Sequence, residues 1–228
     1  VIIQGPPGTG KTYLMAQICD ALLRANYRVM VTALTNRALI ELAEKEHLKN
    51  ALNEGHIFKT SLTADEHKNE EIKGINPLKN LKEQKPPLLL STYYVMSQIA
   101  TKAMEEEHFD YIIVEEASQA FLSTIALARK LGNKFIIIGD VCQLEPIIQK
   151  EYSTEDPNNF HWMVCGLKTL SYCYRNSKNY ILTDSYRLTA NAVKTTNVFY
   201  KDRLNSKSAE ALPIPLRNGS TAYHLLKH

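Results

Sequence analysis

The chain has 228 residues, of which 44% are hydrophobic and 22% are charged, and its formal net charge is +3. This composition is typical of a soluble globular protein with one large domain or slightly more than one. The small positive charge permits a nucleic-acid partner but does not argue for one. No apolar run approaches the roughly 18 residues of a membrane span, and no signal peptide is visible, so we expect no membrane association.

The four cysteines predict neither a zinc site nor disulfide bonds. They form no C-x-x-C pair and lack a histidine spacing suited to zinc. Reduced, structural thiols of an intracellular protein, cytoplasmic or nuclear, are the expected interpretation. The chain begins with Val1, already inside an expected strand and without an initiator Met, so we expect a piece of a longer protein.

The first expected elements enclose a phosphate-binding loop. An apolar strand at Val1–Ile3 precedes the loop, and a helix with one apolar face is predicted from Lys11 to Ala25. Glycines let successive backbone N–H groups turn toward phosphate oxygens, and the helix N-terminus adds its positive dipole end. The spacing fits G-x-x-x-x-G-K-[ST]. The predicted nucleotide-binding residues are Gly5, Pro6, Pro7, Gly8, Thr9, Gly10, Lys11 and Thr12.

Strand-like and helical segments then alternate along the chain. The expected strands are 28–32, 88–90, 111–114 and 135–138, and the expected helices begin at Thr35 or cover 118–131 and 189–200. Residues 47–87 are polar and weakly periodic, which predicts helical pieces and loops at the periphery. Continuous apolar strands are typical of a parallel sheet buried on both faces. The predicted fold is therefore an α/β P-loop NTPase with a mainly parallel sheet and helices on both faces.

Two acids follow the apolar strand that ends at Val114. In P-loop ATPases the first acid at this place binds magnesium through water, and the second polarises the attacking water. We therefore expect the Thr12 hydroxyl to bind Mg²⁺ and Glu115 to bind it through water. Glu116 is expected to be the general base. Exposed Glu pairs are common, so the strand before them and the loop upstream carry this interpretation.

A second strand ends in Gly139-Asp140-Val141-Cys142-Gln143-Leu144-Glu145-Pro146, which would place a neutral amide beside the acidic pair. Gln143 can hydrogen-bond the γ-phosphate or the attacking water without competing as a base. An ordinary Gly-Asp turn would leave Gln143 unexplained.

The phosphate-binding loop, Glu115-Glu116-Ala117-Ser118-Gln119, the Gly-Asp-x-x-Gln-Leu-x-Pro segment and Ser185-Tyr186-Arg187-Leu188 together resemble superfamily 1 helicases. The resemblance is to the 5′→3′ group with the Upf-like, senataxin-like and Dna-type helicases. It continues through Asn197 to Leu204, where the chain is similar to the group's N-x-F-Y-x-x-x-L run.

The resemblance implies ATP and Mg²⁺ as cofactors and assigns further roles. Lys11, Glu116, Gln143 and Arg187 would be the catalytic residues, with Gln143 sensing the γ-phosphate and Arg187 reaching it from the second RecA-like domain. Thr35, Asn36, Arg37 and Thr92 would contact the sugar-phosphate backbone of single-stranded DNA or RNA. Taken alone, Thr35 reads equally well as a helix N-cap, and Arg37 as a solvated residue.

The chain departs from the family pattern at two places. Glu115 stands where the family has Asp, and the extra methylene moves the carboxylate outward by about 1.5 Å, which can disturb the octahedral shell of magnesium. Ser185 stands in place of Gln, and Leu188-Thr189 in place of Met-His. The second change bears on the interface between domains more than on catalysis.

By resemblance, residues 1–182 would be the first RecA-like domain and 183–228 the truncated start of the second. The expected function is the ATP-hydrolysing motor domain of a superfamily 1 helicase, whose other partners are the rest of the second RecA-like domain and accessory domains. We expect the isolated chain to hydrolyse ATP poorly and to be unable to unwind nucleic acid. One alternative is a nucleic-acid-binding module whose ATPase has weakened or decayed, and Glu115 supports it. A non-helicase P-loop ATPase is disfavoured by the Gln143 and Arg187 segments.

Overall fold

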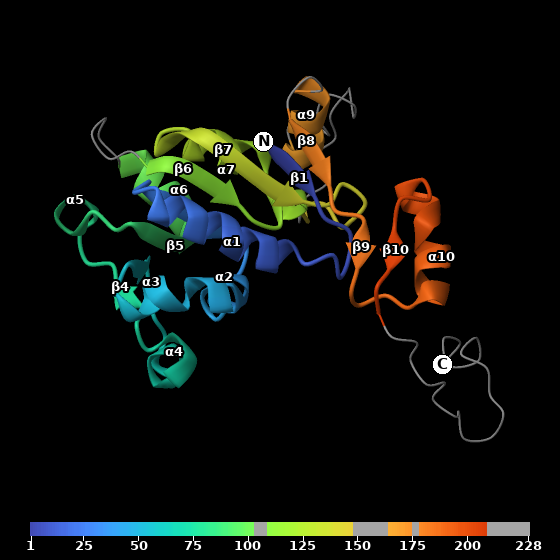
Figure 1. Ribbon diagram of the computed structural model, residues 1–228. Helices are drawn as coiled ribbons and strands as arrows, with labels where there is room; N and C mark the ends of the chain where they lie inside the picture. Colours follow the sequence, from blue (N-terminus) through green and yellow to red (C-terminus); the bar gives the residue numbers. More distant parts are fainter. Residues whose placement is uncertain (103–108, 148–163, 175–177, 209–228) are drawn as a thin grey trace, which may run out of the picture.

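The computed structural model describes residues 1–102, 109–147, 164–174 and 178–208. A parallel eight-stranded sheet with the order β4-β3-β5-β2-β6-β7-β1-β8 forms the larger part of the molecule (Figure 1). Its strands are β1 (Ile2–Gln4), β2 (Val29–Ala33), β3 (Ile57–Lys59), β4 (Asn76–Pro77), β5 (Leu88–Thr92), β6 (Phe109–Val114), β7 (Gly132–Gly139) and β8 (Asn179–Ile181). This arrangement confirms the predicted α/β fold.

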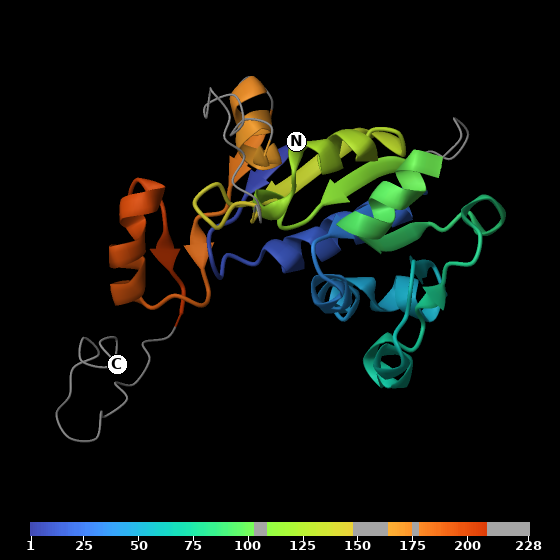
Figure 2. The same ribbon diagram turned by 180° about the vertical axis from the view of Figure 1, so that it is seen from behind.

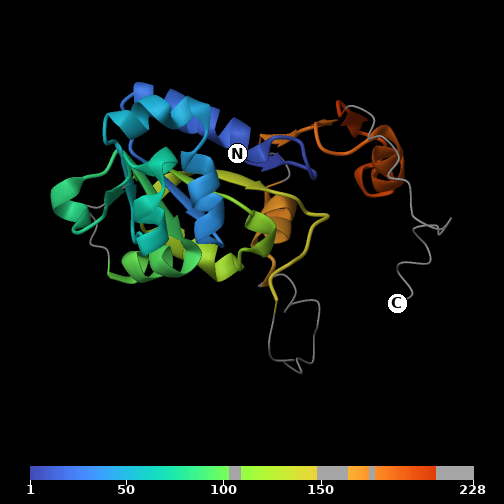
Figure 3. The ribbon, with the colours of Figure 1, turned by 90° about the horizontal axis from the view of Figure 1, so that it is seen from below.

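Helices cover both faces of this sheet, and each face has its own hydrophobic cluster. Viewed from below, the blue and cyan helices lie on one side of the strands and the green and yellow-green helices on the other (Figure 3). One side holds α1 (Lys11–Arg24), α2 (Asn36–Ala43) and α3 (Lys49–Asn53), and the other holds α6 (Tyr93–Lys102), α7 (Leu122–Ala128) and α9 (Gly166–Cys173). Strands buried on both faces explain the continuous apolar runs in the sequence.

Residues 183–208 form a separate small unit beside the sheet, which Figure 2 shows from behind. Its two strands, β9 (Asp184–Ser185) and β10 (Asn205–Ser206), pair in parallel, and α10 (Ala190–Tyr200) connects them. The Thr189 hydroxyl accepts a hydrogen bond from the Ala192 N–H and so caps α10. We call residues 183–208 the small unit and the described residues of 1–182 the large unit.

Several sequence-based expectations need correction. The segment 47–87 contributes the strand β3 and the edge strand β4 besides its helical pieces, which are η1 (Glu46–Leu48), α3, α4 (Ala64–Lys68), η2 (Glu70–Ile72) and α5 (Leu81–Gln84). The strand β3 was missed because it is short and contains Lys59, which is fully buried and pairs with Glu66 at 3.1 Å. The helix expected over 118–131 is a 3₁₀ turn, η3 (Ala117–Gln119), followed by the shorter α7. The sequence patterns predict neither the helix α6 nor the strand β8.

None of the helices in the described part of the chain is long and apolar enough to cross a membrane. The four cysteines are free; Cys19 and Cys165 are buried, whereas Cys142 and Cys173 are exposed. Of the segment 183–228, expected to begin a second domain, residues 209–228 lie outside the described part.

Candidate nucleotide and nucleic-acid site

The phosphate-binding loop joins β1 to α1 at the carboxyl edge of the sheet. Gly8 and Gly10 have φ values of 73° and 81°, in the left-handed region that glycine adopts without strain. A Cβ on Gly5 would lie 2.2 Å from the Cγ of Lys11, so the loop is too tight there for any other residue. The Lys11 ammonium lies within the loop, where Nζ donates to the Gly5 carbonyl at 2.6 Å and to the Pro6 carbonyl at 3.4 Å.

The first acid after β6 meets the hydroxyl that follows Lys11. Thr12 Oγ1 donates to Glu115 Oε1 at 3.2 Å. Glu115 is only 4% exposed, and its second oxygen, Oε2, is buried without a hydrogen-bond partner among the described residues. Burial and the nearby negative charge of Glu116 raise the pKa of Glu115 to about 7, against the opposing hydrogen bond from Thr12.

These two side chains fit a magnesium ion. Hydroxyl and carboxylate oxygens are the ligands that Mg²⁺ prefers, and it keeps several waters and substrate phosphates in its shell. The orphaned Oε2 of Glu115 is an acceptor that a metal-bound water could satisfy. Within the described residues no three His, Cys, Asp or Glu side chains form a group that could hold a metal ion.

The second acid, Glu116, has a left-handed backbone with φ 52° and ψ 38°. This conformation is uncommon for a residue with a side chain, and such strain concentrates at functional sites. Glu116 is half-buried, whereas Glu115 is buried. The turn at Glu116 therefore separates the two adjacent carboxylates, with the first held against Thr12 and the second still accessible.

The loop after β7 lies beside the phosphate-binding loop. The Gly5 N–H donates to the Gly139 carbonyl at 2.9 Å, and the Gln143 N–H donates to the Asp140 carbonyl at 3.0 Å. Gln143 is half-buried. The predicted sensor Gln143 thus follows a turn that is bonded directly to the start of the phosphate-binding loop.

The small unit packs against the phosphate-binding loop. Ser185 Oγ donates to the Pro7 carbonyl at 3.0 Å, and the Tyr186 N–H donates to the Gly8 carbonyl at 2.9 Å. A Cβ on Gly8 would lie 2.4 Å from the Cβ of Arg187. These contacts bring Arg187 to the nucleotide site.

The charges around Lys11 shift its pKa in opposite directions. Burial lowers the pKa of Lys11 most strongly, and the charges of Asp140, Glu115 and Glu116 oppose that shift. The positive charge of Arg187 lowers the pKa further. Lys11 and Arg187 therefore lie close enough to interact, although they belong to different units.

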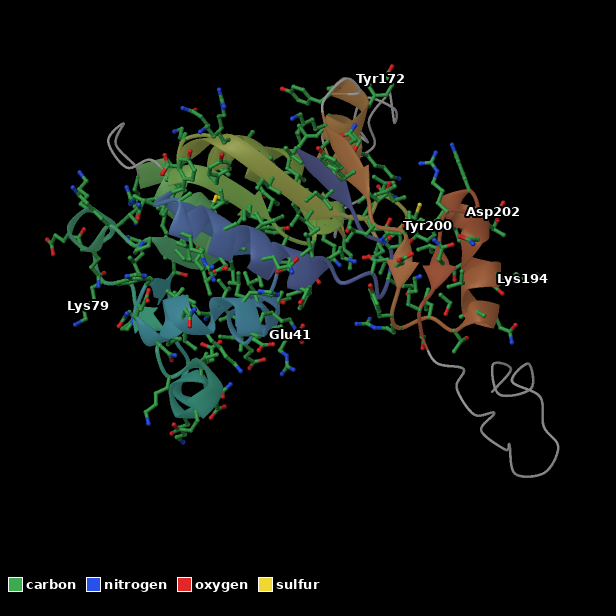
Figure 4. All side chains as sticks on the ribbon, viewed as in Figure 1. Glu41, Lys79, Tyr172, Lys194, Tyr200 and Asp202 are labelled. Carbon is green, nitrogen blue, oxygen red and sulfur yellow. The ribbon has the colours of Figure 1, made fainter. Side chains whose placement is uncertain are left out.

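The four residues expected to contact nucleic acid lie at the same sheet edge. The Thr35 hydroxyl accepts from the Ala38 N–H at 3.2 Å, which confirms its alternative role as the N-cap of α2. Asn36 is exposed, and Arg37 forms an exposed ion pair with Glu41, which Figure 4 labels. Thr92 ends β5, where it is in register with Ala33 of β2. The Thr35 and Thr92 segments therefore emerge from neighbouring strands.

Three further residues, which were not among the predicted site residues, support the site. Gln4 Nε2 donates to Asp140 Oδ1 at 3.2 Å, just before the phosphate-binding loop. The buried Tyr93 hydroxyl donates to the backbone carbonyl of Glu115. Tyr200 OH donates to Asp140 Oδ2 at 2.6 Å from the small unit. Gln4 and Tyr93 have no signal in the sequence beyond their positions next to motif residues, whereas Tyr200 is the Tyr of the N-x-F-Y-x-x-x-L run.

The chain is similar to a known protein family and to known helicases. The family described as "AAA domain" matches residues 1–149. The DNA replication ATP-dependent helicase/nuclease DNA2 of Saccharomyces cerevisiae is 26% identical over 240 residues, covering 97% of this chain and 15% of that protein. The Xenopus laevis DNA2 is 26% identical over 217 residues, covering 91% of this chain and 20% of that protein. The chain thus spans a small part of these relatives.

Solved structures show the same fold. The Arterivirus nonstructural protein 10 helicase, in complex with DNA, aligns with a TM-score of 0.57 at 14% identity, covering 96% of this chain and 45% of that chain. The PRRSV helicase aligns with a TM-score of 0.54 at 14% identity, covering 95% of this chain and 38% of that chain. The chain belongs to the AAA domain family, and the homologues that it matches are superfamily 1 helicases.

Proposed function

We propose that this chain is the ATP-binding and ATP-hydrolysing motor domain of a superfamily 1 helicase. It couples ATP hydrolysis to movement on single-stranded DNA or RNA. The observation that carries the proposal is the meeting of five groups at one sheet edge: the phosphate-binding loop, the Thr12–Glu115 contact, Glu116, the Gln143 loop, and Arg187 from the small unit. A structural turn has no need of this combination.

In the proposed reaction, the loop N–H groups and Lys11 bind the β- and γ-phosphates. Lys11 Nζ exchanges its carbonyl partners in the loop for phosphate oxygens. Glu116 accepts a proton from the attacking water, whose oxygen bonds to the γ-phosphorus as the bond to the leaving ADP oxygen breaks. Gln143 orients the water or the γ-phosphate, and Arg187 stabilises the charge of the transferring group.

Magnesium, when bound, neutralises phosphate charge and would be held by Thr12 and, through water, by Glu115. The carboxylate must be ionised for this role. Since its pKa is raised to about 7, Glu115 is partly protonated near neutral pH before the ion binds.

The nucleic-acid track is proposed to cross the ends of β2 and β5. Hydroxyls, amides and helix N-termini are common partners of nucleic-acid phosphates, and Thr35, Asn36 and Thr92 supply such groups. Arg37 would exchange its exposed partner Glu41 for a phosphate. A nucleic-acid substrate also implies an intracellular place of action.

The proposed domain division follows the two units. Residues 1–182 would be the first RecA-like domain and 183–228 the start of the second. The rest of the second RecA-like domain and accessory domains of a longer protein would complete the motor. The small unit's hydrogen bonds to Pro7 and Gly8 support this division, because they place a separate parallel β-α-β unit against the phosphate-binding loop.

A second candidate is a nucleic-acid-binding module with a weakened or decayed ATPase. It is favoured by Glu115, where superfamily 1 helicases have Asp, and by the raised pKa of that carboxyl. The intact Lys11, Glu116, Gln143 and Arg187 favour the working motor.

The deciding experiment measures ATP turnover by the full-length protein, alone and with single-stranded DNA or RNA oligonucleotides. Lys11→Ala is the matched variant. Stimulation by one strand type, abolished in Lys11→Ala, supports the motor and names its track. Strand binding without turnover in either protein supports the decayed ATPase instead.

A further inference from the structure

A fully buried carboxylate stands at the end of β7, next to the nucleotide site. Asp140 has 0% exposure, and it takes no part in the proposed reaction. Its Oδ1 accepts from Gln4 Nε2 at 3.2 Å and from the Cys142 N–H at 3.1 Å, and its Oδ2 accepts from Tyr200 OH at 2.6 Å. In the described part of the chain Asp140 has no ion-pair partner, so these three donors stabilise the buried group.

The three donors come from three separate segments. Gln4 ends β1 immediately before the phosphate-binding loop, and Cys142 lies in the loop that carries Gln143. Tyr200 is the last residue of α10 in the small unit. One carboxylate therefore connects the phosphate-binding loop, the Gln143 loop and the small unit.

Tyr200 is built to hold its hydroxyl in this place. It is 5% exposed, and its ring packs with Val193 and Leu204 in the hydrophobic cluster of the small unit. Figure 4 labels Tyr200 on the side of α10 that faces the eight-stranded sheet. Burial and the hydrogen bond to Asp140 raise the pKa of Tyr200, so the hydroxyl is a neutral donor at physiological pH.

A second contact runs beside this hydrogen bond. Cys142 Sγ donates to the Phe199 carbonyl at 3.6 Å, and Phe199 directly precedes Tyr200. The Gln143 N–H donates to the carbonyl of Asp140. A shift of Gln143 against the γ-phosphate thus acts on a turn that contains Asp140 and Cys142, and both of these residues are bonded to the end of α10.

We propose that Tyr200 is a positioning residue, which through its hydrogen bond to Asp140 transmits the state of the Gln143 loop to the small unit. The inference rests on the proposed function, because it assigns the coupling between nucleotide and nucleic acid to a specific contact. The two hydrogen bonds from Ser185 and Tyr186 hold the small unit to the phosphate-binding loop. The Tyr200 hydrogen bond, beside the contact from Cys142 Sγ, holds it to the loop that carries Gln143.

The test uses Tyr200→Phe in the full-length protein, since this change removes the hydroxyl and keeps the ring in its cluster. We expect kcat in the presence of the stimulating single strand to fall about tenfold, the scale of losing a hydrogen bond to a charged group, with an unchanged KM for ATP. Tyr180→Phe is the control, because Tyr180 is 55% exposed on β8, and it should behave as wild type.

A double-mutant cycle with Asp140→Asn separates coupling from general damage. Once Asp140 has been replaced, Tyr200→Phe should cause little further loss. Thermal unfolding of each variant reports the structural effect separately. A role in packing alone would lower the melting temperature without a selective fall in strand-stimulated kcat.

Three outcomes overturn the inference while leaving the proposed function intact. The strand-stimulated kcat of Tyr200→Phe could equal that of the wild type, or Tyr180→Phe could lose as much kcat as Tyr200→Phe. In the third, Tyr200→Phe lowers kcat by its full amount even in the Asp140→Asn background. A wild type with no strand-stimulated turnover, equal to Lys11→Ala, overturns the proposed function and this inference with it.

Discussion

The two units of the molecule are held in place by different forces. The large unit has a hydrophobic cluster on each face of its sheet, built from strands that are buried on both sides. Among its described residues, the small unit has one small hydrophobic cluster of Val193, Tyr200 and Leu204, with Leu188 packed against them. Buried apolar area therefore stabilises the large unit, whereas hydrogen bonds to the phosphate-binding loop and to Asp140 position the small one.

This difference has a functional consequence. A unit positioned by a few polar contacts at the proposed nucleotide site moves more easily when those contacts change than a unit whose sheet is buried on both faces. The proposed catalytic groups divide between the two units. Lys11, Glu116 and Gln143 belong to the large unit, and Arg187 belongs to the small unit.

The largest effect is expected when the contribution of the small unit to catalysis is removed. Arg187→Ala should lower ATP turnover by about 10³–10⁵, the range for an arginine that stabilises a transferring phosphoryl group. Nucleotide affinity should change far less, because the phosphate-binding loop is untouched. Steady-state turnover and nucleotide titration of the full-length protein measure the two. Arg203→Ala, another exposed arginine of the small unit, should retain activity, and an equal loss there would contradict the assignment.

The next largest effect concerns the general base proposed in the large unit. Glu116→Gln should lower ATP turnover by about 10²–10⁴, the contribution of a general base, while nucleotide binding persists. The amide keeps the size of the side chain and cannot accept the proton. Single-turnover hydrolysis measures the effect. If turnover is unchanged, there was little catalysis to lose, and the decayed-ATPase candidate gains.

How far the sequence predicts the structure also differs between the two units. The phosphate-binding loop and the acid pair follow apolar strands, so local pattern placed Lys11 and Glu115 correctly at the sheet edge. The contacts of Ser185 and Tyr200 depend on how the small unit packs against the large one, which no local pattern encodes. The pattern does not predict the short strand β3, because the strand contains a charged residue, Lys59. That residue is buried and forms an ion pair with Glu66.

A smaller effect concerns the stability of the large unit. The pKa of Glu115 is about 7 in the folded protein against an ordinary 4.5, so the folded state binds more protons between these values. By linkage, the free energy of unfolding falls as pH rises through this window, and ionised Glu115 costs on the order of 3 kcal/mol above it. Glu115→Gln should therefore stabilise the metal-free protein by up to that amount at pH 8.

The gain from Glu115→Gln should be smaller at pH 5, where part of the cost has not yet appeared. Urea denaturation in the presence of a chelator, at both pH values, measures it. Glu145→Gln is a matched control, since Glu145 forms an ion pair with Lys168 outside this site, and its removal should not stabilise the protein. An equal stability gain at both pH values would contradict the assigned pKa.

The smallest expected effect sharpens the comparison between the units most directly. Ser185→Ala removes the hydrogen bonds to the Pro7 carbonyl and from the Leu188 N–H, at 3.0 Å and 3.2 Å. We expect a cost of about 1–2 kcal/mol, confined to the docking of the small unit. Hydrogen exchange should therefore accelerate in residues 183–208 and not in strands β2, β5 and β6. Thr195→Ala, which removes an exposed hydrogen bond within α10, is the control and should leave the docking contacts unchanged. Equal acceleration in both units would mean that they unfold together, and the small unit would then be part of one cooperative domain.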